Sequence, residues 1–264
     1  MGLSNVAASR LAVLCISIGV SQAFAKDEIL LGSMTPEEMQ KQYVVDIGLA
    51  GVVSNKYDGS DKYNIYPLPL IAFSRFYLPA LGQVKDGVQG GVFVYPSFGY
   101  VSERKPSDGE KLRGTRKIDW AGEIGIGGGY RHDWFRGFIE VRHGFNGNTG
   151  VVGRAGLDFI YSPLEQWTFS LGPRADFADS DYMETYFGLS SSAAYGPYSA
   201  DGGFKSVGLV GRVSYSVMED ITLHLQGGWD RLIGDASDSP VTETDNMFTV
   251  ALGATYRFDF NLFD

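Results

Sequence analysis

The chain has 264 residues and a formal net charge of −9, with 44% hydrophobic residues, 14% aromatic residues, 35 glycines and one cysteine. This apolar content excludes intrinsic disorder, a single cysteine excludes an internal disulfide framework, and the acidic balance argues against a nucleic-acid partner. Length alone permits one large domain or two small ones.

Residues 1–25 have the pattern of a secretory signal peptide. Arg10 precedes an apolar run over residues 11–20, and Ala23-Phe24-Ala25 has the small-x-small form of a cleavage site. The run is too short to cross about 30 Å of hydrocarbon as a helix, and no later stretch approaches about 18 consecutive apolar residues. We therefore expect an exported chain without a membrane-spanning helix.

Residues 26–42 do not alternate, and they predict a short N-terminal periplasmic segment. Thr35-Pro36-Glu37-Glu38 is typical of a helix start, with Thr35 as N-cap and Glu38 at the third helical position. A helix of one to two turns through Gln42 is predicted. It lies either free in the periplasm or folded into the mouth of the barrel that the following residues predict.

From Tyr43 onward, apolar and polar residues alternate with a period of two, which is typical of β-strands. Ten strands are predicted, at residues 43–54, 64–76, 88–103, 118–132, 136–146, 150–161, 166–178, 205–217, 221–233 and 246–260. A short extra pair within residues 76–86 would give twelve. An even count is expected of such a barrel, so we favour twelve, with ten as the alternative.

Three features favour a membrane barrel over a soluble sandwich. The segments run about 10–13 residues, long enough to cross a bilayer at a tilt. Aromatic residues recur at strand ends, as membrane interfaces require, and short links alternate with long ones in the C-terminal half. The polar faces hold Arg, Asp, Glu and Gly, which suits a small barrel interior. We predict an all-β, up-and-down antiparallel transmembrane barrel over residues 43–264, in the outer membrane.

Charged residues on the polar faces of successive strands predict a network of ion pairs inside this barrel. Charges away from water are stable only when they are paired, so a filled interior is the first interpretation. A charged, water-filled channel is the alternative. The predicted network consists of Glu123, Glu140, Arg142, Arg154, Asp158, Arg174, Asp176, Arg212 and Arg257.

The sequence holds no recognisable catalytic or metal-binding set. Its histidines, His132, His143 and His224, are not clustered as a metal site requires, and no Gly-x-Ser-x-Gly elbow or phosphate loop occurs. Acidic residues near 176–184 and 230–238 do not have the spacing of a calcium-binding EF-hand loop. We expect no cofactor and no enzymatic activity, with a Ser–His pair of the outer-membrane phospholipase kind as the alternative.

Several ordered segments resemble the MipA/OmpV family of outer-membrane proteins. They are residues 57–61, 66–70, 171–189, 203–209, 231–240 and 253–258. The resemblance implies a scaffold in the lipid of the outer membrane that is linked to the peptidoglycan machinery. Its implied partners are a lytic transglycosylase, which is a murein hydrolase, and a penicillin-binding synthase. A small solute channel and an outer-membrane hydrolase are the alternatives.

Gly253, Tyr256 and Phe258 fit the Gly-x-x-aromatic-x-aromatic pattern by which barrel proteins of this compartment are recognised for assembly. Such patterns commonly end the chain, whereas here residues 259–264 follow. We predict that the three residues form the barrel-assembly signal and that the tail is a periplasmic extension. The alternative is that the tail serves as a second, poorer signal.

Overall fold

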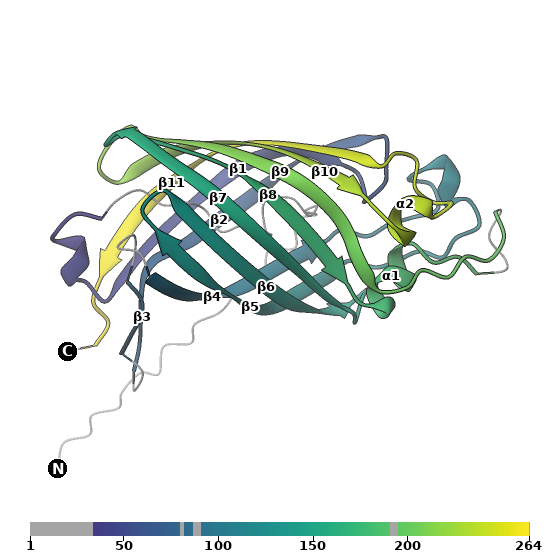
Figure 1. Ribbon diagram of the computed structural model, residues 1–264, viewed down its shortest axis with the longest axis horizontal. Helices are drawn as coiled ribbons and strands as arrows, with labels where there is room; N and C mark the ends of the chain where they lie inside the picture. The colour runs from purple at the N-terminus through teal and green to yellow at the C-terminus, as the bar shows by residue number, and fades with distance from the viewer. Residues whose placement is uncertain (1–33, 80–81, 87–90, 191–194, 264) are drawn as a thin grey trace, which may run out of the picture.

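A computed structural model describes residues 34–79, 82–86, 91–190 and 195–263 of the chain. The predicted signal peptide, residues 1–25, lies outside them. The described residues contain one eleven-stranded antiparallel sheet in the order β3-β2-β1-β11-β10-β9-β8-β7-β6-β5-β4. Its first and last strands in sequence, β1 and β11, pair with each other over most of their length, so the sheet curls into an up-and-down barrel (Figure 1). The strands are β1 (Tyr43–Asn55), β2 (Tyr63–Leu78), β3 (Gly82–Asp86), β4 (Gly91–Val101), β5 (Ala121–His132), β6 (Phe135–Asn146), β7 (Val151–Leu164), β8 (Trp167–Ala178), β9 (Gly203–Ser216), β10 (Ile221–Leu232) and β11 (Asn246–Phe260).

The predicted all-β barrel is confirmed. Each of the ten predicted strands is present with bounds that agree within three residues, and β3 is an additional short strand inside the 76–86 stretch. The described count therefore falls between the two predicted numbers. Strand β6 begins at Phe135, one residue before the predicted start, so only residues 133–134 link it to β5. Among the described residues, the helices are all too short or too polar to cross a membrane.

Side chains alternate between an exposed apolar outer face and a buried polar inner face. In β11, Leu252 is 64% exposed while its neighbour Ala251 is 1% exposed. An apolar band of this extent would not be stable in water, and it matches the lipid-facing surface of a membrane barrel. The band includes Leu49, Ile71, Ile124, Ile126, Ile139, Val141, Leu157, Leu171, Leu209, Leu225, Val250 and Leu252.

The two ends of the sheet meet at a seam between β2–β3 and β4. No backbone ladder joins β4 to β2 or β3 among the residues described. Proline lacks an N–H, and the strands beside the seam contain Pro67, Pro69 and Pro96. The ladders to β1 and β5 run through these prolines without a break, so the missing donors fall on the seam side. The sequence thus removes N–H groups at the edge where no partner strand would accept them.

Long loops fold over one end of the barrel, the extracellular end by their length (Figure 1). They carry η2 (Glu110–Leu112), α1 (Ser180–Tyr186) and α2 (Asp235–Asp238). Asp179 caps α1, because its carboxylate accepts from the Tyr182 N–H at 3.0 Å. The loops bury an apolar cluster that contains Val101, Ile118, Tyr182, Met183, Phe187 and Leu232. This cluster covers the extracellular opening of the barrel, and we call it and the loops that carry it the roof.

The N-terminal segment and the C-terminal tail contact each other at the opposite, periplasmic end. Thr35 and Glu38 form a reciprocal capping box, with N–H to side-chain distances of 2.6 and 3.2 Å. The helix is a single 3₁₀ turn, η1 (Glu38–Gln40), and is shorter than predicted, because Lys41 is already extended. Gln42 is not helical and contacts residues 261–263 of the C-terminal tail. Its side-chain oxygen accepts hydrogen bonds from the N–H groups of Leu262 and Phe263, both at 2.9 Å.

Candidate functional site

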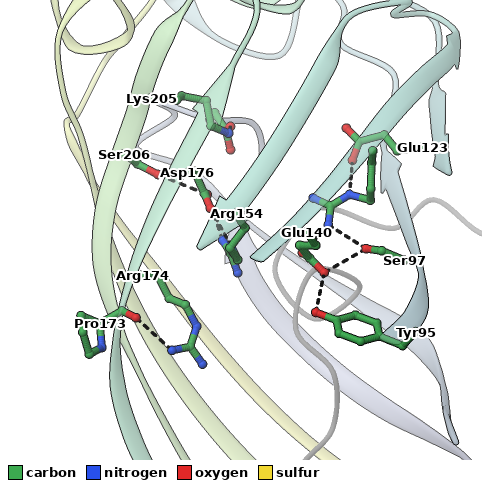
Figure 2. Close-up of polar contacts among 12 residues, drawn as sticks. Tyr95, Ser97, Glu123, Glu140, Arg154, Pro173, Arg174, Asp176, Lys205 and Ser206 are labelled. Carbon is green, nitrogen blue, oxygen red and sulfur yellow. Dashed lines mark hydrogen bonds and ion pairs between the residues drawn. The ribbon is translucent and has the colours of Figure 1, made fainter. Parts of the chain in front are cut away.

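The barrel interior holds a continuous set of buried charges, the lumen network, and Arg142 is its most enclosed cation. The Arg142 guanidinium is 2% exposed; its Nε donates to Glu123 at 3.0 Å and its Nη1 to Glu140. Ser97 links the same groups, accepting from Arg142 and donating to Glu140 at 2.9 Å (Figure 2). Strands β4, β5 and β6 supply these residues, so the cluster ties three neighbouring strands together on the inner face of the barrel wall.

Two further arginine–aspartate clusters occupy the next strands. Arg154 of β7 binds both carboxylate oxygens of Asp176 in β8, at 2.6 and 2.9 Å, and Ser206 donates to the same carboxylate (Figure 2). Asp158 lies between two arginines, Arg136 at 3.1 Å and Arg174 at 2.5 Å. The structure therefore brings the predicted residues together in pairs. Arg136, which was not part of the predicted network, belongs to this cluster.

The Arg174 side chain also replaces a backbone hydrogen bond that is missing from the β7–β8 ladder. The register passes from Gly156–Arg174 to Phe159–Leu171 and skips the residues between, which include Pro173. Because Pro173 has no N–H, the opposite carbonyl needs another donor. Arg174 Nη1 supplies it, lying 2.9 Å from the Leu157 carbonyl oxygen. The same Nη1 lies 3.0 Å from the Pro173 carbonyl oxygen (Figure 2).

The remaining strands carry a more mixed polar interior. Arg212 donates twice to the Gln226 side chain. Arg257 binds Asp46 at 3.1 Å and reaches Glu38 of the N-terminal segment at 3.5 Å. The network thus extends from the barrel wall to the N-terminal segment. Asp46, Glu38 and Gln226 were missed in the sequence, although the two strand residues lie on the inner face that the alternation defines.

His224 is fully enclosed in the lumen and has no carboxylate partner among the described residues. Its Nδ1 lies 2.9 Å from Ser214 Oγ and its Nε2 lies 2.9 Å from Thr255 Oγ1. A hydrolytic serine needs a histidine that a third group orients and a nucleophile that substrate can reach. Ser214 and His224 are 3% and 1% exposed, so the arrangement is that of a buried polar bridge between strands.

The residues of the predicted assembly signal lie on the closing strand β11. Tyr256 and Phe258 point outward, and their rings contact each other with centroids 4.8 Å apart. The strand continues two residues beyond Phe258, with Asp259 opposite Val44 and Phe260 opposite Tyr43. The tail is therefore joined to β1 and to Gln42 rather than extending freely.

A small polar cavity lies under the extracellular loops, where strand ends from both sides of the barrel meet. It has room for about 60 Å³ of solvent, which corresponds to about four to six waters. We call it the mouth cavity. Its lining includes Tyr57, Asp58, Arg104, Tyr186, Lys205 and Asp230. Lys205 pairs with Asp58 at 2.6 Å, whereas Arg104 has no carboxylate within ion-pair distance in the described part of the chain.

The chain was compared with known proteins by sequence and by structure. No curated protein matches the sequence. Among solved structures, the chain is similar to Neisserial surface protein A (12% identity, 83% of this chain and 97% of that one, TM-score 0.28). It is also similar to the outer membrane protein OprD from Pseudomonas aeruginosa (9% identity, 92% and 98%, TM-score 0.31). Likeness at this level says nothing about what this protein binds.

The sequence comparison is more specific. The family described as "MltA-interacting protein MipA" matches residues 47–258, which include almost the whole barrel from β1 to β11. The match covers the strands that carry the lumen network as well as the loops that roof the mouth. With its lipid-facing apolar band and its polar, ion-paired interior, this chain is an outer-membrane β-barrel that belongs to the MipA family.

Proposed function

We propose that this protein is a non-enzymatic scaffold of the outer membrane that binds a murein hydrolase at its periplasmic end. The observation that carries the proposal is the filled lumen: Arg142, Arg154 and Arg174 are each held by carboxylates in the barrel interior. An interior committed to holding the wall together favours a structural role over transport. The family name supports the choice of partner, because it describes a protein that interacts with MltA.

The periplasmic end offers a surface suited to such a partner. The tail is held in place by Gln42, whose side chain also donates to the Phe263 carbonyl at 2.6 Å. This leaves the side chains of Leu262 and Phe263 65% and 44% exposed. Exposed apolar groups on an ordered backbone are typical of interface anchors. We infer that the hydrolase contacts this tail, and that a penicillin-binding synthase joins the same assembly.

The absence of catalysis is part of the proposal. His224 is the one histidine of the described chain that is hydrogen-bonded to a serine, and both are enclosed. Lipid and peptide turnover by the refolded protein should therefore not exceed that of the His224→Gln variant. Turnover that His224→Gln abolishes would contradict the proposal and favour a hydrolase.

Binding of a purified lytic transglycosylase to the protein in lipid nanodiscs tests the scaffold directly. Replacing Leu262 and Phe263 by serine keeps the backbone hydrogen bonds to Gln42 and removes the exposed apolar groups, together with the contact of the Phe263 ring with Tyr77. We expect this double variant to weaken binding by at least about tenfold. Tyr195→Ser, a change of an exposed aromatic residue at the extracellular end, is the matched control and should bind as the parent does. A parent protein that shows no saturable binding would refute the proposal.

Liposome swelling separates the scaffold from the channel alternative. Because buried, paired side chains occupy the barrel interior, proteoliposomes that contain the protein should swell in sugars or amino acids no faster than empty liposomes. Swelling that increases with the amount of reconstituted protein would favour the channel.

A further inference from the structure

The mouth cavity contains a buried arginine whose hydrogen-bonding capacity is only partly used. Arg104 is 5% exposed. Its Nη1 donates to the Tyr186 carbonyl oxygen at 2.5 Å, while its Nε has no hydrogen-bond partner in the described structure. A guanidinium that is desolvated without a carboxylate is unfavourable unless something else balances its charge. The position therefore suggests an acceptor that is not part of the described chain.

Arg104 is held rigidly, so its free edge has a fixed direction. Its backbone forms an isolated bridge with Ile118, with both N–H···O distances at 2.9 Å. The rings of Tyr57 and Tyr186 flank the guanidinium, with centroids 5.8 and 6.0 Å from its central carbon. Cation–π contacts of this kind hold the charge without using its N–H groups. The guanidinium is thus pre-organised, which lowers the cost of binding a ligand.

A second unused donor lines the same cavity. The Tyr186 hydroxyl is buried and has no hydrogen-bond partner among the described residues. Burial raises the pKa of this phenol well above its ordinary value, so the group keeps its proton and can donate. Two orphaned donors at one cavity are a recurrent sign of a bound acceptor, because each buried donor without a partner is unfavourable.

Several of the other charges that line the cavity are paired. Lys205 pairs with Asp58, Asp176 is bound by Arg154, and Lys56 pairs with Asp108 at 2.9 Å. Asp230 also lines the cavity and adds a negative charge to it. A ligand with several negative charges would therefore be repelled. The room of about 60 Å³ restricts the ligand to a few non-hydrogen atoms.

We propose that the mouth cavity binds a small monocarboxylate, whose carboxylate accepts hydrogen bonds from Arg104 Nε and from the Tyr186 hydroxyl. The planar guanidinium edge matches a carboxylate, and the ring walls on either side suit a short apolar or hydroxylated tail. The site faces the extracellular loops and does not involve the periplasmic tail, so it stands independently of the scaffold proposal.

Calorimetric titration of the full chain in nanodiscs with acetate, lactate or pyruvate tests the site. We expect saturable binding with one site per chain. Tyr186→Phe removes only the orphaned hydroxyl and keeps the ring and the carbonyl, so it should weaken binding about tenfold to a hundredfold. Without ligand, Tyr186→Phe should unfold at the same temperature as the parent or a higher one, because a buried donor without a partner is removed.

Arg104→Lys keeps the charge and loses the planar fork, and it should weaken binding at least as much. Exposed Arg116 and Tyr195 provide the matched controls Arg116→Lys and Tyr195→Phe, which should bind as the parent does. Parent affinity in Tyr186→Phe and Arg104→Lys would overturn the proposal. So would tighter binding of inorganic phosphate than of any carboxylate, or no saturable binding, in which case the cavity holds only water. Binding of the transglycosylase should be the same in all four variants.

Discussion

Arg142 illustrates why the charges inside this barrel depend on one another. Two carboxylates, Glu123 and Glu140, approach one guanidinium in a space that is closed to water. Ser97 and Tyr95 donate to Glu140 at 2.9 and 3.3 Å and offset part of the second negative charge. Each member is desolvated, so each is stable only while the others remain. Removing one residue should consequently affect stability more than a count of its contacts suggests.

Replacing Arg142 by Met should lower the free energy of unfolding by about 3–5 kcal/mol, because it leaves two buried carboxylates without a cation. The triple variant Arg142→Met, Glu123→Gln, Glu140→Gln removes the charges together and should recover most of this loss. Urea unfolding in lipid vesicles, followed by tryptophan fluorescence, measures both. Arg113→Met, at an exposed position, is the control. A triple variant no more stable than the single one would contradict the argument.

At the scale of the elements, the strands were predictable and their pairings within the lumen network were not. Alternation places a residue on the inner or outer face, and every member of the predicted network is indeed buried. Which partner each charge meets depends on the register between strands, as with Asp158 opposite Arg136 in the β6–β7 ladder. Residue types do not encode that register. Arg136 was missed because it is the first residue of the predicted strand, where alternation does not yet define a face, and Glu38 because it lies outside the alternating region.

The lipid-facing apolar band predicts that the free-energy cost of introducing a charge depends on its position along the strand. Leu252 lies near the middle of β11 and Leu164 at the periplasmic end of β7, and both are exposed, at 64% and 61%. Leu252→Arg should cost about 2–4 kcal/mol, because the charge would lie near the bilayer midplane, whereas Leu164→Arg should cost about 0–1 kcal/mol at the interface. Unfolding in lipid vesicles measures the difference. Equal costs would mean that the band does not lie across the membrane as described.

Changes at the end of the closing strand β11 can distinguish the assembly of the barrel from its stability once it is assembled. Deleting residues 259–264 removes the Tyr43–Phe260 ring contact, the Lys41–Asp259 ion pair at 3.0 Å and the contacts with Gln42. We expect the shortened protein to insert nearly as well as the parent but to unfold at a lower temperature. Phe258→Ala in the full chain should instead reduce the amount of assembled barrel, measured as the fast-migrating band on unheated detergent gels. If only the deletion abolishes insertion, the signal is Phe260 or Phe263.

At the scale of the whole molecule, the barrel type was predictable but its seam and its roof were not. The alternating pattern and the aromatic strand ends are local properties that the sequence displays directly. The roof depends on contacts between loops far apart in sequence, such as the hydrogen bond from Ser239 to the Phe187 carbonyl at 2.6 Å. The seam depends on which strands fail to pair, and its only visible signs are the prolines in β2 and β4.

The seam should be detectable by hydrogen exchange in detergent. An amide of β10 has ladders on both sides, to β9 and β11, and must open a hydrogen bond before it exchanges. Amides on the outer edge of β4, and on that of β2 before its pairing with β3 begins at Arg75, have no strand partner in the described barrel, so they need only contact with water. We therefore expect fast exchange at alternate residues of β4 and of β2 up to Ser74, and slow exchange throughout β10. Unpaired groups inside the hydrocarbon cost several kcal/mol each, and every seam proline removes one such donor. Replacing Pro67 and Pro69 by valine restores two donors and should add two fast-exchanging amides if the seam is open. If the new amides exchange as slowly as those of β10, backbone hydrogen bonds close the barrel at this position.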